Sequence, residues 1–270
     1  MSTNCTHRLG CTFNADGIHF ALWAPSAQQV SLCLYHKSSH SVNYVESHDG
    51  YTLGDFIRLA LKQNQNHQQL NSNTSHGHEN EQDNEHAIID RADHEVIRLQ
   101  KLAGFMLFVS QGVCMIHAGQ EWARSKVLEP ATIHQDAVYD HDSYNKDSDL
   151  NYLDFDKKDS SLGVFDYYRR LIELRKSEKA LRNSSPEAIV FKVYQDSLHI
   201  TFSIDGESTG SLYTYFISIN CNRYQSYEII LPEGKWELVL TEKLVPKEKF
   251  VEHTYLVPYS AGVLLRQKRS

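Results

Sequence analysis

The stretch Val42-Asn43-Tyr44-Val45-Glu46-Ser47-His48-Asp49 joins an apolar segment to a cluster of acidic and imidazole groups. Its first half has the composition of a short buried strand, and a helical pattern follows from about Leu53 to Gln63. This order predicts a β/α unit. Enzymes built as (β/α)8 barrels carry their chemistry at the carboxyl ends of the strands. Glu46, His48 and Asp49 therefore stand where a barrel would present functional groups.

Two interpretations of the His48-Asp49 pair follow from the residues alone. Such a pair can bind sugar hydroxyls and stabilise developing positive charge on a sugar ring. Alternatively, Asp49 caps the helix that follows and His48 packs beside it. The residue types by themselves favour the capping interpretation.

The chain divides into three parts that differ in their pattern of apolar residues and in the secondary structure this pattern predicts. Residues 1–40 contain alternating patterns for two or three strands, which is a fragment of a β domain. Residues 41–183 give the order strand, helix, helix, strand, loop, helix, which is two β/α units. Residues 184–270 predict a small antiparallel β-sandwich. Its seven strands are expected at 188–194, 197–204, 212–220, 226–231, 235–240, 254–257 and 261–266.

An insert at residues 63–90 interrupts the middle part and is dominated by Asn, Gln, His, Ser and Glu. Too few apolar groups are present to offset the entropy of ordering the chain, so the composition predicts disorder. The insert contains His67, His76, His78 and His86, and clustered imidazoles can bind a metal. Disorder is the stronger interpretation, and we expect no metal site.

Composition excludes several classes of protein. The net charge is −7 and no basic run is present, which argues against binding to nucleic acid or to a membrane surface. The N-terminal residues lack the apolar core of a signal peptide, and the longest apolar run, Leu102–Val109, is too short to span a bilayer. The five scattered cysteines include no C-x-x-C pair and indicate reduced thiols. We therefore expect a cytoplasmic location.

Residues 42–53, which extend the opening stretch through Gly50-Tyr51-Thr52-Leu53, resemble the fourth conserved region of glycoside hydrolase family 13, the α-amylase superfamily. The similarity is greatest to its debranching members, the isoamylases and type I pullulanases. Residues 112–126, with Gly119-Gln120-Glu121-Trp122, resemble their eighth barrel strand and the loop after it. Residues 142–155 resemble their substrate-facing loop, and residues 9–25 resemble the opening of a family 48 carbohydrate-binding module.

The resemblance implies a retaining glycosidase that hydrolyses α-1,6 linkages in pullulan, starch or glycogen. Such enzymes use an aspartate nucleophile, a glutamate acid/base and a second aspartate that stabilises the transition state. Asp49 matches the stabilising aspartate, and His48 matches the sugar-binding histidine beside it. The resemblance implies α-glucan as the ligand and requires no cofactor. It further implies glucan contacts at Tyr44, Arg124, Tyr144, Asn145 and Asp149.

The other two catalytic groups of that family have no match in this sequence. The nucleophile normally stands in a Gly-x-Arg-x-Asp motif on a strand, and no strand-like segment carries one. A complete barrel takes roughly 250 residues, which is more than residues 41–183 provide. We therefore expect the last two β/α units of a barrel, without debranching activity of their own. Three alternatives remain: a non-catalytic α-glucan-binding protein, an inactive pseudogene product, and a chain that associates with another carrying the missing strands.

Overall fold

The structure is a computed structural model of the 270-residue chain. It describes residues 10–14, 17–21, 41–71, 81–129, 138–158, 162–243 and 249–269. The chain forms two compact units, Met1–Tyr35 and His36–Ser270. In the first unit, β1 (Gly10–Asn14) and β2 (Gly17–Ala21) pair in antiparallel fashion. The third strand that the sequence suggests near residues 30–35 lies outside the described residues.

The second unit begins with a parallel pair of short strands, β3 (Val42–Asn43) and β4 (Val113–Cys114). The amide of Val113 donates to the carbonyl of Ser41 at 2.8 Å, and the amide of Met115 donates to that of Asn43 at 2.9 Å. Both strands lie within the two segments that the sequence predicts as buried strands. Their parallel pairing agrees with two consecutive β/α units.

Two long helices connect these strands. Leu53, Ile57 and Leu61 of α1 (Leu53–Asn71) pack against Val96 of α2 (Glu81–Val109). Both helices continue into residues 63–90, where the sequence predicts disorder: α1 ends at Asn71 and α2 begins at Glu81. The apolar periodicity fails there, but Gln and Glu, which are frequent in these residues, have good intrinsic helix propensity. Residues 72–80 lie outside the described part.

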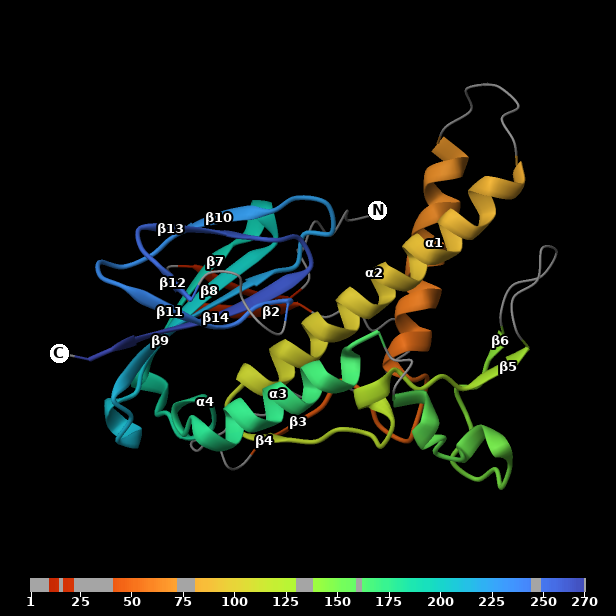
Figure 1. The fold of residues 1–270 in the computed structure, drawn as a ribbon, viewed down its shortest axis with the longest axis horizontal. Helices are drawn as coiled ribbons and strands as arrows, with labels where there is room; N and C mark the ends of the chain where they lie inside the picture. Colours follow the sequence, from red (N-terminus) through yellow and green to blue (C-terminus); the bar gives the residue numbers. More distant parts are fainter. Residues whose placement is uncertain are drawn as a thin grey trace, which may run out of the picture. The chain divides into compact units, whose positions relative to one another are not determined.

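The chain after β4 forms short elements and then α3 (Val164–Ser177) and α4 (Ala180–Asn183). Figure 1 shows α3 lying along α2. Between β4 and α3 lie the strands β5 (Val127–Glu129) and β6 (Val138–Tyr139) and the 3-10 helices η2 (Gln120–Trp122), η3 (Asp149–Asn151) and η4 (Phe155–Lys158). Three further 3-10 helices follow α4: η5 (Pro186–Ala188), η6 (Gln195–Ser197) and η7 (Glu207–Thr209).

The C-terminal part is a six-stranded antiparallel sheet with a two-stranded sheet beside it. The large sheet has the order β12-β11-β14-β9-β8-β7, and β10 pairs with β13. These strands are β7 (Ile189–Tyr194), β8 (His199–Asp205), β9 (Tyr213–Asn220), β10 (Tyr227–Ile230), β11 (Trp236–Leu240), β12 (Phe250–Val251), β13 (Thr254–Val257) and β14 (Ala261–Lys268). Each of the seven predicted segments contains a strand, and β12 is additional.

The large sheet separates two hydrophobic cores. One core joins the sheet to α2 and α3, where Phe105 and Tyr168 are fully buried beside Ile217 and Leu264 of the sheet. The other core fills the space between the sheet and the β10–β13 pair, around Trp236. Because alternate residues of a strand face opposite sides, the same strands supply both cores. The sheet therefore fixes α2 and α3, and these helices in turn carry β4.

A buried arginine closes the junction beneath β4. The Arg175 guanidinium donates to the carbonyls of Phe108 and Ser110 at the end of α2, of Gly112 before β4, and of Leu181 in α4. Carbonyls at a helix C-terminus have no partners within the helix and carry partial negative charge. Arg175 donates hydrogen bonds to these carbonyls and thereby fixes the path of the chain from the end of α2 into β4.

Candidate functional site

The loop after β3 is built around a buried carboxylate. Glu46 is 5% exposed, and its Oε2 accepts from the backbone amide of Leu53, the first residue of α1, at 2.9 Å. Its Oε1 lies 2.8 Å from Nδ1 of His117, on the loop after β4. A carboxylate at a helix N-terminus satisfies an amide that has no partner within the helix. Glu46 therefore joins the two loops and is fully engaged in doing so.

A second buried carboxylate ties the same two loops together. Asp55 of α1 is completely buried. Its Oδ1 accepts from the hydroxyl of Ser125 at 2.6 Å, and its Oδ2 accepts from the backbone amide of Lys126 at 2.7 Å. The Lys126 side chain is also buried and donates from Nζ to the carbonyls of His48, at 3.1 Å, and Gly50, at 3.4 Å. Burial lowers the pKa of Lys126, and the neighbouring Arg124 charge lowers it further.

The predicted catalytic pair sits on top of this support and faces solvent. The side chains of His48 and Asp49 are 73% and 70% exposed, and His48 Nε2 lies 3.3 Å from Asp49 Oδ1. The first turn of α1 receives its side-chain bonds from Glu46 and from Thr52, whose hydroxyl accepts from the Asp55 amide at 3.2 Å. The capping that Asp49 could have provided is thus supplied by two other residues.

A hollow of about 890 Å³ lies between the loop after β4 and the loop around η3. Arg124 contributes one wall and donates from Nη2 to the carbonyl of Leu150 at 3.0 Å. Buried Trp122 forms part of the lining and contacts Phe155 at a ring-centroid distance of 5.2 Å. Tyr152 also lines the hollow and is 62% exposed. Aromatic faces beside a few hydrogen-bonding groups are typical of a small-molecule site.

The structure brings together only part of the predicted glucan-binding set. Arg124 and Asp149 line the hollow together. The remaining predicted residues lie outside its lining and are solvent-exposed; they are Tyr44, His48, Asp49, Tyr144 and Asn145. Their roles stay predictions.

Most residues that line the hollow were not predicted from the sequence, and three of them have aromatic or charged side chains. Trp122, Tyr152 and Asp154 reach the hollow with Arg124 and Asp149. They lie inside the two stretches, 112–126 and 142–155, that carry the resemblance. Aromatic side chains next to polar ones in these two stretches are the pattern from which these residues could have been predicted.

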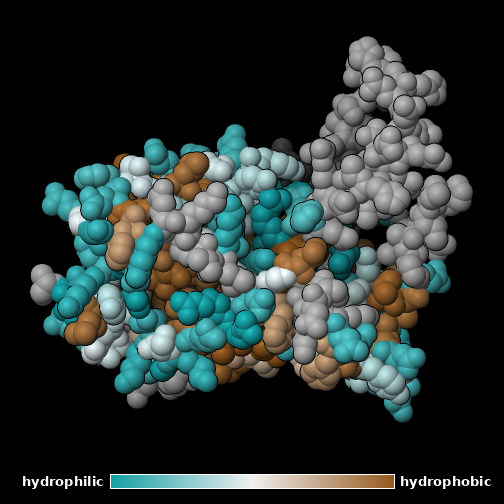
Figure 2. Space-filling model, in the orientation of Figure 1, coloured by the Kyte–Doolittle hydropathy of each residue, from teal (hydrophilic) through white to brown (hydrophobic). Residues whose placement is uncertain are grey.

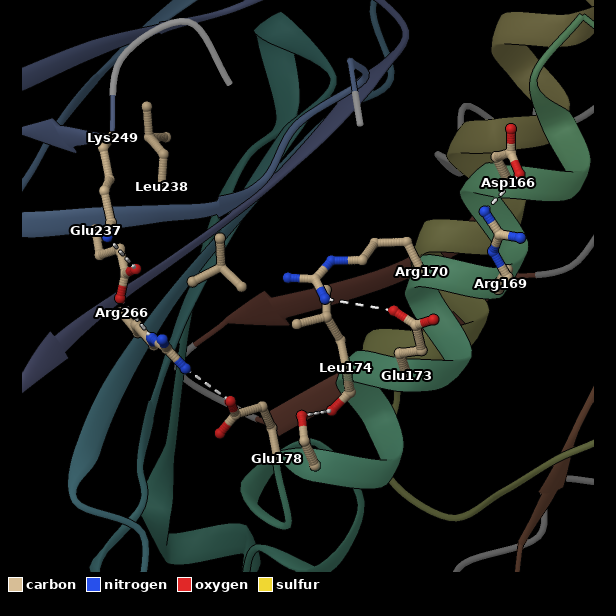
Figure 3. Close-up of a pocket in the computed structure, with 12 residues that line it drawn as sticks. Asp166, Arg169, Arg170, Glu173, Leu174, Glu178, Glu237, Leu238, Lys249 and Arg266 are labelled. Atoms are coloured by element: carbon tan, nitrogen blue, oxygen red, sulfur yellow. Dashed lines mark hydrogen bonds and ion pairs between the residues drawn. The ribbon is translucent and has the colours of Figure 1, made fainter. Parts of the chain in front are cut away.

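A second hollow, of about 690 Å³, lies between α3 and the strands β11 and β14. Figure 3 shows Arg266 between two carboxylates, Glu178 and Glu237, and both ion pairs measure 2.8 Å. Arg170 faces Glu173 at 3.5 Å along α3. Because these charges are paired with one another, this hollow is an ion-pair network that joins α3 to the sheet.

Two further features were searched for in the described residues. No group of three or more His, Cys, Asp or Glu there could hold a metal ion. No helix of the described part has the length and apolarity needed to cross a membrane. The histidines of the polar insert, His67, His76, His78 and His86, have no described side chains.

Comparison with known proteins finds similarity to pullulanases and isoamylases. The family model of carbohydrate-binding module 48, the isoamylase N-terminal domain, matches residues 8–83. The pullulanase of Bacillus subtilis is 28% identical over 174 residues, which is 64% of this chain and 19% of that protein. Chloroplastic isoamylase 1 of Arabidopsis thaliana is 33% identical over 151 residues, which is 52% of this chain and 17% of that protein.

Solved structures give the same result for the fold. The pullulanase of Bacillus acidopullulyticus has a TM-score of 0.61 at 26% identity and covers 85% of this chain and 24% of its own. The pullulanase of Anoxybacillus sp. LM18-11, solved with maltotetraose, has a TM-score of 0.64 at 23% identity and covers 87% of this chain and 29% of its own. This chain therefore spans less than a third of either structure, and about a fifth of the curated relatives.

Proposed function

Because this chain is a distant relative of the pullulanases and isoamylases over a fragment of their length, we propose that it binds α-glucans and does not hydrolyse them by itself. Its binding site is the hollow lined by Trp122, Arg124, Asp149 and Tyr152. The relatives are named pullulanase and isoamylase, and the family model is that of a carbohydrate-binding module. Both support glucan as the ligand class.

The lining of the hollow is the observation that carries the proposal. The exposed ring of Tyr152 offers a flat apolar face, on which a sugar ring can stack. Arg124 donates hydrogen bonds and Asp149 accepts them, which suits hydroxyl groups that both donate and accept. The exposure of Tyr152 leaves the hollow accessible to solvent, as binding to a long polysaccharide requires.

The positions of the described carboxylates argue against hydrolysis by this chain alone. Retaining glycosidases need two carboxyl groups about 5–5.5 Å apart across the bond. Glu46, in the same loop as Asp49, is buried and bonded to the Leu53 amide and to His117. Asp49 stands exposed with His48 beside it. Neither the nucleophile motif nor a strand to hold it occurs in the sequence.

Affinity electrophoresis through glycogen-containing gels tests the binding. We expect glycogen to retard the wild-type chain and Tyr152→Ala to weaken the retardation roughly tenfold, since an aromatic stacking contact contributes about 1 kcal/mol or more. Tyr224→Ala is the matched control, because Tyr224 is 70% exposed in the loop between β9 and β10 and does not line the hollow. Equal mobility with and without glycogen would contradict the binding. Release of reducing ends from pullulan by the purified chain would contradict the absence of hydrolysis.

A further inference from the structure

The parallel pair β3–β4 presents one completely apolar face to solvent. Val42 is paired with Val113 in register, and these side chains are 57% and 48% exposed. Two residues further along, Tyr44 and Met115 are 56% and 40% exposed. Because side chains alternate between the two faces of a strand, these four share one face. Figure 2 shows hydrophobic atoms gathered at the lower border of the molecule, where Figure 1 places β3 and β4.

The opposite face of the same pair is packed. Cys114 and Ile116 lie against the core of α2 and α3, and the Cys114 thiol donates to the carbonyl of Leu107 at 3.1 Å. Asn43 donates from its side chain to the carbonyl of Gln111 at 2.6 Å. Parallel sheets are almost always covered on both faces. Within the described part of the second unit, only the helix-facing side of this pair is covered.

The strand edges are open as well. The carbonyls of Ser41 and Asn43 point toward β4, and backbone groups of neighbouring residues in a strand point to opposite edges. The backbone groups of Val42 and Tyr44 therefore point away from β4. An exposed strand edge beside an apolar face is a template for the addition of further strands.

We propose that this face and its edges dock a second polypeptide that carries parallel strands with covering helices, the remainder of a (β/α)8 barrel. The fold comparison gives the size and shape of such a partner. The catalytic module of a pneumococcal glycogen-degrading protein matches 86% of this chain with a TM-score of 0.64, yet this match covers only 36% of that module. About two thirds of the module has no counterpart here. Strands from that remainder would continue the β3–β4 pair and bury its four apolar side chains.

A second copy of the chain is the competing occupant. Among the described residues its parallel strands would be the same short pair, β3 and β4, so it could cover the apolar face but could not extend a parallel sheet at both edges. The docking surface is separate from the glucan hollow, because none of its four residues lines that hollow. The test of docking therefore succeeds or fails independently of glucan binding.

Co-expression tests the proposal. The tagged full-length chain is produced with the part of the Bacillus subtilis pullulanase barrel that this chain does not match. We expect the barrel part to become soluble and to co-purify with the tag. The double variant Val42→Lys, Val113→Lys should reduce the recovered partner at least tenfold. Ile230→Lys is the control, since Ile230 is 82% exposed on β10.

Two results would overturn the proposal. In the first, the barrel part stays insoluble or unbound beside a folded, soluble chain. In the second, light scattering finds a dimer of the chain alone that Val42→Lys dissociates, which would assign the face to a second copy. Hydrogen exchange gives an independent measure, and we expect the amides of Val42 and Tyr44 to be protected only in the presence of the barrel part.

Discussion

The side-chain nitrogen of Lys126 lies 3.1 Å from the backbone carbonyl oxygen of His48. A lysine on the loop after β4 thus holds the loop after β3, and the same lysine contributes its backbone amide to Asp55 of α1. The exposed His48 and Asp49 side chains depend on this buried contact for their position. The two loops of neighbouring β/α units consequently behave as one structure.

Replacing Lys126 with methionine tests this support. The change keeps the length and apolar stem of the side chain but removes the donors to His48 and Gly50. We expect a loss of stability of about 1–2 kcal/mol, because the lost bonds are partly offset by removal of a buried charge. The rate of amide hydrogen exchange at residues 47–50 should increase by much more than the loss of global stability accounts for.

Lys176→Met is the control for this substitution, because Lys176 is exposed at the end of α3. Urea unfolding measures the global free energy of unfolding, and hydrogen exchange measures local opening at residues 47–50. Unchanged exchange at residues 47–50 in Lys126→Met would show that the loop is held by other contacts.

The sequence predicts the C-terminal part of the fold well because its signal there is local. Period-two alternation between turns locates every one of the seven expected strands. The same method gives no helix in the insert, into which α1 extends to Asn71 and from which α2 begins at Glu81. An insert without an apolar stripe gives no periodic signal, and helix propensity alone decides its backbone. Pairing of β3 with β4 could be expected only from their order and the resemblance.

The site was predicted less completely than the fold because it depends on contacts between distant segments. The motif stretches identify Arg124 and Asp149, which the structure brings to one hollow. The supporting contacts of Glu46 with His117, and of Asp55 with Lys126, join residues about 70 positions apart. No periodicity or spacing rule in a single sequence encodes such a pairing.

A buried histidine predicts how stability depends on pH. His199 is completely buried, and its Nε2 lies 2.6 Å from the hydroxyl of Ser218. Burial lowers its pKa from 6.5 to about 4. Between these values the unfolded chain binds a proton that the folded chain does not. The free energy of unfolding therefore falls as pH decreases from about 6.5 to about 4, by up to roughly 3 kcal/mol from this group.

His199→Gln removes that titration while retaining a polar group that can reach Ser218. We expect the variant to be less stable than wild type at pH 7 and to show a flatter decline between pH 6.5 and 4. His94→Gln, at an exposed position of α2, should leave the decline unchanged. Parallel wild-type and His199→Gln curves in urea titrations over this range would disprove the assignment.

Arg175→Lys should destabilise the junction beneath β4. The guanidinium spans the carbonyls of Phe108, Ser110, Gly112 and Leu181. A lysine ammonium offers fewer donors in a different geometry and leaves some of these carbonyls without a partner. We expect a loss of about 3 kcal/mol in chemical unfolding. Arg170→Lys, at a partly exposed position of α3 where the retained charge still faces Glu173, should cost less than about 0.5 kcal/mol, and equal losses in both variants would rule out the bridging role.

Asp49→Asn tests whether the residue that matches a catalytic aspartate of related enzymes contributes to any activity of this chain. Asp49 matches the family's transition-state stabiliser, yet its side chain is 70% exposed and pairs with His48 at 3.3 Å in solvent. Water solvates a carboxylate and an amide at such a site, so stability should change by less than about 0.5 kcal/mol. Glycogen affinity should stay within about twofold, because Asp49 does not line the hollow. Reducing-end assays on pullulan should give background values for both proteins. Release by the wild type that Asp49→Asn abolishes would instead assign this carboxylate a catalytic role in the chain as it stands.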